Sequence, residues 1–174
     1  MSFEMRHTVT GKEPVQLVDM KLYLRTDYTT DDSIIIALIT AAREQAEKFC
    51  NRSFVSQIIE YSRIVTIWDA SNYTVITLPY PSHLAITEVK VNGTVITDYT
   101  KKGLTQFTLT IPALELLDSS AMCEIYIKYT TTDNCPELVK IALKNMVKDM
   151  AENRNDKQML PNPYTYLAPF KLYV

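Results

Sequence analysis

The sequence contains few of the residues from which catalytic and cofactor sites are usually built. Its 174 residues include only three glycines, no two of them close together, which excludes the glycine-rich loops that bind phosphate groups. The cysteines are Cys50, Cys123 and Cys135, an odd number with wide spacing and no CxxC pair. A disulfide framework or a zinc site is therefore not expected, and we interpret these cysteines as buried apolar side chains in a reducing compartment.

The chain also lacks a strong net charge and a long apolar run. The formal net charge of −2 gives no general attraction to nucleic acid or to an anionic membrane. No apolar stretch approaches the about 18 residues that suggest a membrane span, and the opening Met-Ser-Phe-Glu-Met-Arg-His lacks the apolar core of a secretion signal. With 47% hydrophobic and 22% charged residues, the composition favours a soluble globular protein, and the length favours one domain over residues 1–174.

The polar residues that could act in catalysis have ordinary explanations. His7 and His83 have no cysteine or carboxylate at a recognisable spacing, so we interpret both as exposed loop histidines. Asp31 and Asp32 could in principle bind a divalent metal, but they fit the start of a helix better, as a cap and as negative charge near its positive end. We therefore predict no catalytic residue, no cofactor and no metal site.

Helical spacing of apolar residues dominates the first third of the chain. Leu17, Met20 and Leu24 recur on one side of a segment that predicts a helix over residues 17–25. A longer periodic run follows and predicts a helix over about residues 31–51, with Arg43 and Glu47 away from its apolar stripe.

Residues 54–132 change character and predict a β region. Thr, Val, Ile and Tyr dominate, alternation replaces helical spacing, and turn residues recur at short intervals. Asn92-Gly93 is a strong tight-turn signal, whereas Lys101-Lys102-Gly103 is interpreted as a plain turn. The predicted strands cover residues 56–67, 73–78, 86–91, 95–99, 105–111 and 122–129. The fold class is therefore α+β: a small body of about three helices with an antiparallel β region inserted between the second and last long helices.

The last long helix is predicted over about residues 136–153 and carries a basic row. Pro136 suits the first helical turn, and the apolar face that follows is broad. Lys140, Lys144 and Lys148 stand four residues apart and so line one side of the helix. The row could face DNA phosphates or an acidic partner, or it could be a solvated face with Lys148 paired to Glu152.

Residues 160–174 form a proline- and tyrosine-rich tail that is too apolar to remain solvated. Tyrosine offers a large contact area with a polar tip, which suits partly exposed interfaces. The residues alone leave two alternatives open, a tail folded back on its own domain and a tail docked on a neighbouring protein. The candidate contact residues are Leu160, Tyr164, Tyr166, Leu167, Pro169 and Phe170.

Short motifs follow one another in a particular order along the chain. They are Pro14-Val15-Gln16-Leu17 leading to Leu24-Arg25, the Ile35 to Glu47 run closing on Cys50-Asn51-Arg52-Ser53, Leu78-Pro79-Tyr80-Pro81, Ile86 to Val91, Tyr129-Thr130, Pro136 to Arg154, and Leu167-Ala168-Pro169-Phe170-Lys171. In this order the motifs resemble the head–tail connector proteins of tailed bacteriophages, also called head-completion or DNA-packaging proteins. The resemblance covers nearly the whole chain. One departure is Thr131-Thr132-Asp133, which stands where glycine commonly follows the Tyr-Thr strand end.

The resemblance implies a structural protein of the virion neck, with host cytoplasm as its location during assembly. Such proteins form a ring of roughly twelve copies that matches the portal by symmetry, although the isolated chain can be a monomer. The ring joins head to tail, extends the DNA channel after packaging and receives a stopper or tail-completion protein. DNA passes through without sequence-specific binding, and no membrane is involved.

In the setting of a ring, the tail from Leu160 onward is predicted to dock on the portal or a neighbouring subunit, and the lysine row to border the channel or an acidic neighbour. The alternative function is a non-enzymatic DNA-binding regulator that uses Lys140, Lys144 and Lys148.

Overall fold

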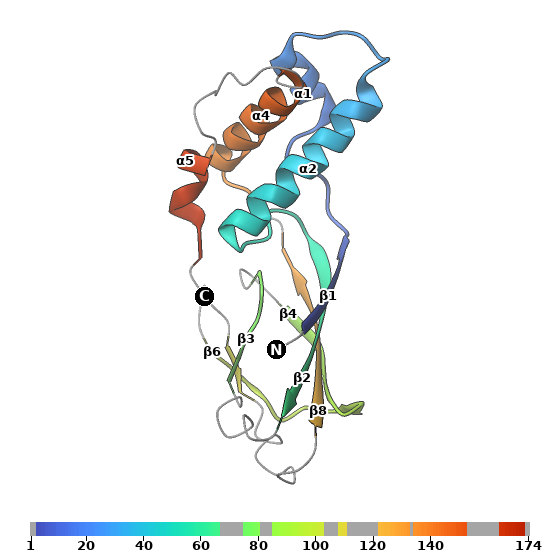
Figure 1. Cartoon of the computed structure of the whole chain (residues 1–174), viewed down its shortest axis with the longest axis vertical. Helices are drawn as coiled ribbons and strands as arrows, with labels where there is room; N and C mark the ends of the chain where they lie inside the picture. Colours follow the sequence, from blue (N-terminus) through green and yellow to red (C-terminus); the bar gives the residue numbers. More distant parts are fainter. Residues whose placement is uncertain are drawn as a thin grey trace. The chain divides into compact units, whose positions relative to one another are not determined.

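The computed structural model describes residues 3–66, 75–80, 85–102, 108–110, 122–132, 134–152 and 164–172. The chain divides into two compact units (Figure 1). The sheet unit consists of Met1–Gly11, Ser56–Thr132 and Val174, and the helical unit consists of Lys12–Val55 and Asp133–Tyr173. The α+β class is confirmed, because one unit is built from helices and the other from antiparallel strands. The single domain over residues 1–174 stays a prediction.

In its described part, the helical unit contains three longer helices close to the predicted positions and a short helical tail. The long ones are α1 (Leu17–Leu24), α2 (Asp32–Cys50) and α4 (Glu137–Glu152), each within one residue of the expected bounds. The tail contains α5 (Tyr164–Leu167) and the 3₁₀ helix η3 (Ala168–Phe170). Left-handed residues end two helices, since Arg25 has φ 54° and Asn51 has φ 50°. In such a position the backbone N–H reaches carbonyls of the last turn.

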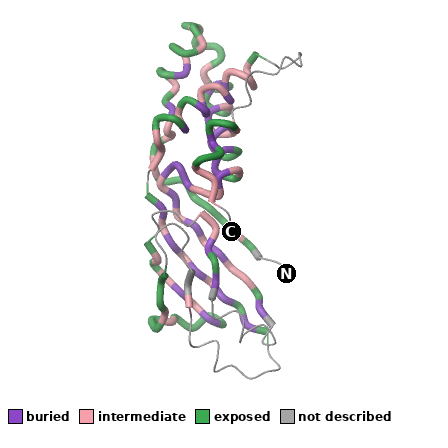
Figure 2. The backbone as a smooth tube through the Cα atoms, turned by 90° about the vertical axis from the view of Figure 1, so that its left-hand side faces the viewer, coloured by how far each residue is buried: buried purple, intermediate pink, exposed green. Residues whose placement is uncertain are grey.

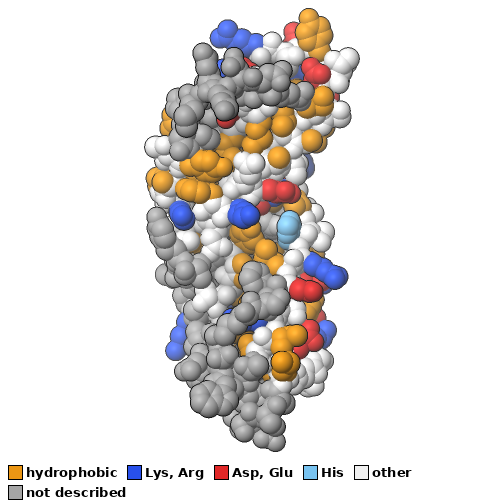
Figure 3. Space-filling model, in the orientation of Figure 1, with side chains coloured by type: hydrophobic (Ala, Val, Ile, Leu, Met, Phe, Trp, Pro, Cys, Tyr) orange, Lys and Arg blue, Asp and Glu red, His pale blue; other side chains and the backbone are white. Residues whose placement is uncertain are grey.

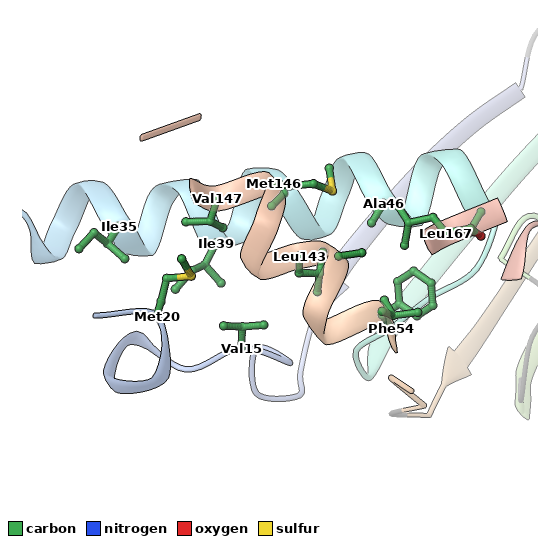
Figure 4. Packing of buried hydrophobic residues seen from close by; sticks show 14 residues of the cluster. Val15, Met20, Ile35, Ile39, Ala46, Phe54, Leu143, Met146, Val147 and Leu167 are labelled. Atoms are coloured by element: carbon green, nitrogen blue, oxygen red, sulfur yellow. Dashed lines mark hydrogen bonds between the residues drawn. The ribbon is translucent and has the colours of Figure 1, made fainter. Parts of the chain in front are cut away.

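The core of the helical unit lies between α1, α2, α4 and the tail (Figure 4). The apolar stripe of α2 faces that of α4, as their helical spacing requires. Met20 of α1 is fully buried, with Leu17 and Leu24 packed beside this core, as the spacing of these three residues predicted. The buried members are Val15, Met20, Ile35, Ile39, Ala42, Ala46, Cys50, Phe54, Val139, Ala142, Leu143, Met146, Val147 and Leu167.

Among its described residues, the sheet unit contains two antiparallel sheets. The larger has the order β1 (Phe3–Val9), β2 (Gln57–Thr66), β8 (Met122–Thr131), β4 (Ala85–Val91) and β5 (Thr94–Val95). The smaller has the order β3 (Val75–Thr77), β7 (Thr108–Thr110) and β6 (Thr100–Lys102). Asn92 (φ 48°) and Gly93 (φ 79°) join β4 to β5, which confirms the tight-turn signal because both residues tolerate positive φ.

Burial alternates along β4 and β8, so that each of these two strands has one core-facing side (Figure 2). In β8 the residues Cys123, Ile125, Ile127 and Tyr129 are buried, and those between them are exposed or half-buried. The Tyr129 hydroxyl donates a 2.6 Å hydrogen bond to the Pro79 carbonyl, and burial raises the pKa of this phenol. This polar tip is therefore satisfied within the core.

Two strands were not expected from the sequence. Phe3–Val9 forms β1 on the edge of the larger sheet, so His7 lies in a strand and not in a loop. Lys101 and Lys102, read as part of a turn, belong to β6 and pair with β7. Each of these segments is a strand because it pairs with a partner strand, and local propensity does not reveal that pairing. His83 lies outside the described residues.

Candidate assembly surfaces

The lysine row of α4 is largely neutralised by neighbouring carboxylates. Lys140 Nζ lies 2.6 Å from Glu137 Oε1, and this hydrogen bond raises the pKa of the lysine. Lys148 Nζ lies 3.9 Å from Glu152 Oε1, the pair that the spacing predicted. Among the described residues, Lys144 makes no ion pair within 4 Å. The row therefore presents one uncompensated charge, and this arrangement favours a solvated face over a DNA-binding stripe.

Lys144 and Lys148 also line a groove between α1 and α4 with a volume of about 650 Å³. Tyr23 of α1 donates a 2.6 Å hydrogen bond to Asn145 Oδ1 of α4 and ties the two helices together. Two apolar residues of α1, Val18 and Leu22, are 76% and 80% exposed. The groove carries charges of both signs, and its lining residues are Asp19, Leu22, Tyr23, Leu24, Arg25, Lys144, Lys148 and Glu152.

The C-terminal tail packs against the end of α2. Leu167 is 0% exposed and belongs to the helical core. The Leu172 N–H donates a 2.8 Å hydrogen bond to the Cys50 carbonyl, and the Cys50 thiol lies 3.6 Å from the Leu167 carbonyl. The ring of Tyr164 lies 4.9 Å from that of Phe49, centroid to centroid. These contacts hold the tail on its own unit.

The other tail candidates differ in how far they are available to a partner. Tyr166 and Pro169 are exposed, whereas Tyr164 and Phe170 are half-buried beside the core. Leu160 lies outside the described residues. Leu167 anchors the tail, so the surface that the tail offers is carried by the residues on either side of it.

The helical unit contains a buried ionic cluster that the sequence did not predict. Arg43, expected away from the apolar stripe, is 1% exposed. Its Nε donates to Glu13 Oε2 at 2.9 Å and its Nη1 to Glu47 Oε2 at 2.6 Å. Glu47 Oε1 also accepts a 2.7 Å hydrogen bond from the Phe54 N–H. Burial by itself would lower the pKa of the Arg43 guanidinium, but Glu47 and Glu13 outweigh it and the pKa is raised.

This cluster joins segments that are distant in sequence. Glu13 precedes α1, Arg43 and Glu47 lie in α2, and Phe54 follows it. An arginine and glutamate four residues apart were a visible signal, but nothing in the sequence shows that they are buried. Fully paired, the charges rigidify the unit and offer no free group for catalysis.

The described cysteines and aspartates do not form a reactive site. Burial raises the pKa of Cys50 to about 11 and that of Cys135 to about 12, so both thiols stay protonated near neutral pH. Asp31 occupies the N-cap position of α2, but its side chain makes no capping hydrogen bond, so the predicted side-chain cap is wrong. Asp32 accepts a 2.7 Å hydrogen bond from Lys21 Nζ. Over the described ranges, no group of three His, Cys, Asp or Glu residues could hold a metal ion.

The sheet unit carries charges of both signs, and basic and acidic side chains lie next to each other on the face seen in Figure 3. Lys128 Nζ of β8 lies 3.0 Å from Glu60 Oε1 of β2. Lys90 Nζ of β4 lies 2.8 Å from Glu88 Oε1 and 5.3 Å from the centre of the Tyr126 ring. This side of the sheet is therefore a charged outer surface.

None of the helices described is long and apolar enough to cross a membrane.

Comparison with known proteins decides the family. Residues 14–102, a little over half of the chain, match the family described as phage gp6-like head-tail connector protein. The chain belongs to this family. No curated protein matches the sequence. The matched segment of this connector-family chain contains α1, α2 and the strands β2 to β6, whereas α4 and the tail lie beyond it.

Solved structures with the same fold come from gene transfer agent (GTA) particles. A chain from the neck of an empty GTA particle, computed with C6 symmetry, is 13% identical with a TM-score of 0.73. A chain from the virion of the native particle is 12% identical with a TM-score of 0.72, and one from the native neck with C12 symmetry has a TM-score of 0.63. Each comparison covers 97% of this chain and 96% of the other. At this identity the similarity shows the fold, and it extends over both units.

Proposed function

We propose that this protein is a structural adaptor subunit of a virion neck, which forms a ring under the portal, joins head to tail and extends the DNA channel. The family match over residues 14–102 is the observation that carries the proposal. The fold shared with GTA neck chains over nearly the whole length adds support. We further propose that the sheet and helical units act as one connector domain, because the chain passes between them directly at Gly11–Lys12, Val55–Ser56 and Thr132–Asp133.

The proposed ring contains roughly twelve copies, in which one surface of each subunit meets a different surface of the next. C12 symmetry was used for one of the GTA necks that share the fold. The other proposed partners are the portal and a stopper or tail-completion protein. The protein would reside in the virion neck, after assembly in host cytoplasm, and would hold DNA in its channel without reading its sequence.

A role without catalysis is proposed with it. The family is one of connectors, and the charged cluster around Arg43 is buried and mutually paired, which suits a rigid building block. The DNA-binding alternative is weakened by Glu137 and Glu152, which neutralise two lysines of the row.

Native mass spectrometry with the portal protein of the same virus tests the function. The expected result is a complex in which portal subunits and connector subunits are present in rings of matching symmetry. A chain that never associates with the portal, either after mixing of the purified proteins or during co-expression, would contradict the proposal.

We propose the outward side of the tail, Tyr166 and Pro169 with the half-buried Tyr164 and Phe170, as its contact with the portal or a neighbour. Removing the whole tail would also remove Leu167 from the core, so substitution gives the sharper test. Tyr166→Ser should abolish ring assembly and leave folding intact, whereas the matched variant Thr165→Ser, also exposed on α5, should assemble normally. Normal assembly of Tyr166→Ser would mean that the tail serves only its own unit.

We also propose that the lysine row borders the channel or an acidic neighbour, and that Lys144 makes the main contact. Lys144→Glu should reduce assembly or DNA retention, because Lys144 is the lysine of the row that has no carboxylate oxygen within 4 Å among the described residues. Lys144→Gln and Lys148→Gln are the matched pair, and only Lys144→Gln should show the loss, since Glu152 already offsets Lys148. If Lys144→Glu leaves both assembly and DNA retention unchanged, the row is a solvated face.

A further inference from the structure

Four charged residues form one row across four strands of the larger sheet. Arg6 of β1 stands opposite Glu60 of β2, Glu60 opposite Lys128 of β8, and Lys128 opposite Glu88 of β4. We call these four residues the charge row. Their signs alternate, and neighbouring members attract: Lys128 and Glu60 are 3.0 Å apart, and both Lys128 and Arg6 lower the pKa of the Glu60 carboxyl, Lys128 by the larger amount. Opposite charges on adjacent strands are the stabilising arrangement for such pairs.

The two ends of the charge row differ in sign. Arg6, exposed on β1, ends the row with a positive charge, and Glu88 on β4, which also pairs with Lys90 at 2.8 Å, ends it with a negative one. In the part of the chain that the structure describes, no strand pairs with the outer side of β1. On the other side of the sheet, β5 pairs with β4 at Lys90 and Val91, and the Ile96 N–H donates a 2.9 Å hydrogen bond to the Val89 carbonyl. No described strand pairs with the outer side of the segment from Ala85 to Glu88.

Strand direction makes these two edges compatible. Each neighbouring pair in the order β1, β2, β8, β4 is antiparallel, so β1 and β4 run in opposite directions. A second copy placed head to tail would therefore continue the antiparallel order. The alternation of charge would also continue, because positive Arg6 would come to lie beside negative Glu88. An open strand edge with its unpaired N–H and C=O groups is a template for such an addition.

We propose that neighbouring copies of this chain join through their sheet units, with the Arg6–Val9 half of β1 against the Ala85–Glu88 edge of β4 in the next copy, across the bulge between Ile86 and Glu88, and with Arg6 facing Glu88. The inference rests on the proposed ring and names its subunit contact. Such a contact is heterologous, since two different edges meet, and repetition of it yields a ring when the angle closes. A symmetric contact between two β1 edges would use the same surface twice and stop at a dimer.

Cysteine cross-linking tests the contact directly. Within one subunit Arg6 and Glu88 are three strand spacings apart, about 14 Å, while a disulfide needs Cα atoms within about 7 Å. The double variant R6C/E88C can therefore link only between copies. Under mild oxidation it should give a reducible ladder of covalent multimers. The wild-type chain should give none, because Cys50 and Cys123 are buried and Cys135 is half-buried.

The cross-linking is run at high protein concentration both with and without the portal protein of the same virus, while ring formation by the wild-type chain is measured separately. A ladder in either condition supports the contact, and its absence from both overturns it. Rings of wild-type chain without a ladder would refute the contact and leave the proposed function standing. A ladder without rings on the portal would refute the proposed function and leave the contact standing. Covalent dimers from R6C alone, with no larger species from the double variant, would replace the proposal with a β1–β1 dimer.

Charge exchange gives a second test that needs no oxidation. Each of R6E and E88K places like charges at the contact and should lower the ring yield by at least about tenfold. In an equimolar mixture every contact can again join opposite charges if the two variants alternate, so the yield should return to near that of wild type. Circular dichroism of each variant confirms folding. Two folded variants that each assemble as well as wild type, or a mixture that stays defective, would overturn the proposal.

Discussion

The helical unit and the sheet unit use their charges in opposite ways. In the helical unit these charge pairs close within the unit: Arg43 is enclosed by Glu13 and Glu47, and Lys140 reaches back to Glu137 three residues earlier. In the sheet unit the charges run across strands and end with opposite signs at two edges. Apart from Lys144, the charge pairs described here for the helical unit are therefore closed within it, whereas the charge row of the sheet unit reaches two strand edges. This difference favours the sheet edges as subunit contacts.

Burial separates the two kinds of charge energetically. Arg43 is removed from water, so its pairing is needed to hold the unit together. Glu60 and Lys128 face solvent, where ion pairs contribute little to the stability of a single chain. Surface charges of the second kind can be changed without unfolding the protein, which makes them suitable for recognition.

The largest effect is expected from breaking the buried cluster. Arg43→Ala leaves Glu47 buried without its cation and should lower the free energy of unfolding by about 3–5 kcal/mol. Urea denaturation measures the loss. The control is Glu44→Ala, since Glu44 lies 3.6 Å from Arg43 Nη2 but is 54% exposed, and its removal should cost within about 0.5 kcal/mol. Equal losses for the two variants would mean that the helical unit does not depend on its enclosed charge.

A somewhat smaller loss is expected where the tail enters the helical core. Leu167→Ala opens a cavity beside Phe54 and the helices and should cost about 2–4 kcal/mol. Tyr166→Ala, one residue earlier and 36% exposed, should cost less than about 1 kcal/mol. Thermal unfolding followed by circular dichroism gives both values. If Leu167→Ala is as stable as wild type, the tail is not part of the core.

Calorimetry of the same Leu167→Ala variant asks whether the two units behave as one domain. A single domain predicts one transition whose midpoint falls by about 2–4 °C for each kcal/mol lost, with equal calorimetric and van't Hoff enthalpies. A second transition that keeps the wild-type midpoint would show that the sheet unit unfolds independently and would contradict the single-domain prediction.

The smallest effect is expected at the exposed pair of the charge row. Lys128 lowers the pKa of Glu60 by a hydrogen bond and by its charge. Because the folded-state pKa is the lower one, the pair adds stability above the unfolded pKa of Glu60, and this stability is lost as the pH falls through the folded value. Lys128→Met should therefore raise the Glu60 pKa, as measured by carbon NMR of the carboxyl group. Lys90→Met, which removes a lysine paired to Glu88, should leave it in place. An unchanged Glu60 pKa in Lys128→Met would remove the electrostatic link along the row.

The sequence predicted elements well where a periodic pattern was long. The runs behind α2 and β8 are strongly helical and strongly alternating, so their types and positions follow from local pattern. By contrast, β1 is short and its partner β2 begins 48 residues after β1 ends, so its alternating Phe3, Met5, His7 and Val9 were too weak a signal on their own. Tertiary pairing, which no local pattern encodes, decides such strands.

The candidate sites also divide into those that follow from local spacing and those that depend on tertiary contacts. The Lys148–Glu152 pair follows from helical spacing and is present. The burial of Arg43 does not follow from it, because Glu13 approaches from another part of the chain. The charge row needed the register of four strands, so none of its members could be recognised as a set beforehand.

Electron microscopy of the protein bound to the portal of its own virus tests the central claim most directly. The expected result is a closed connector ring beneath the portal, coaxial with the DNA channel, in which each sheet unit touches the next copy. A portal that recruits only isolated subunits, or none, would contradict the role of this protein as a neck adaptor.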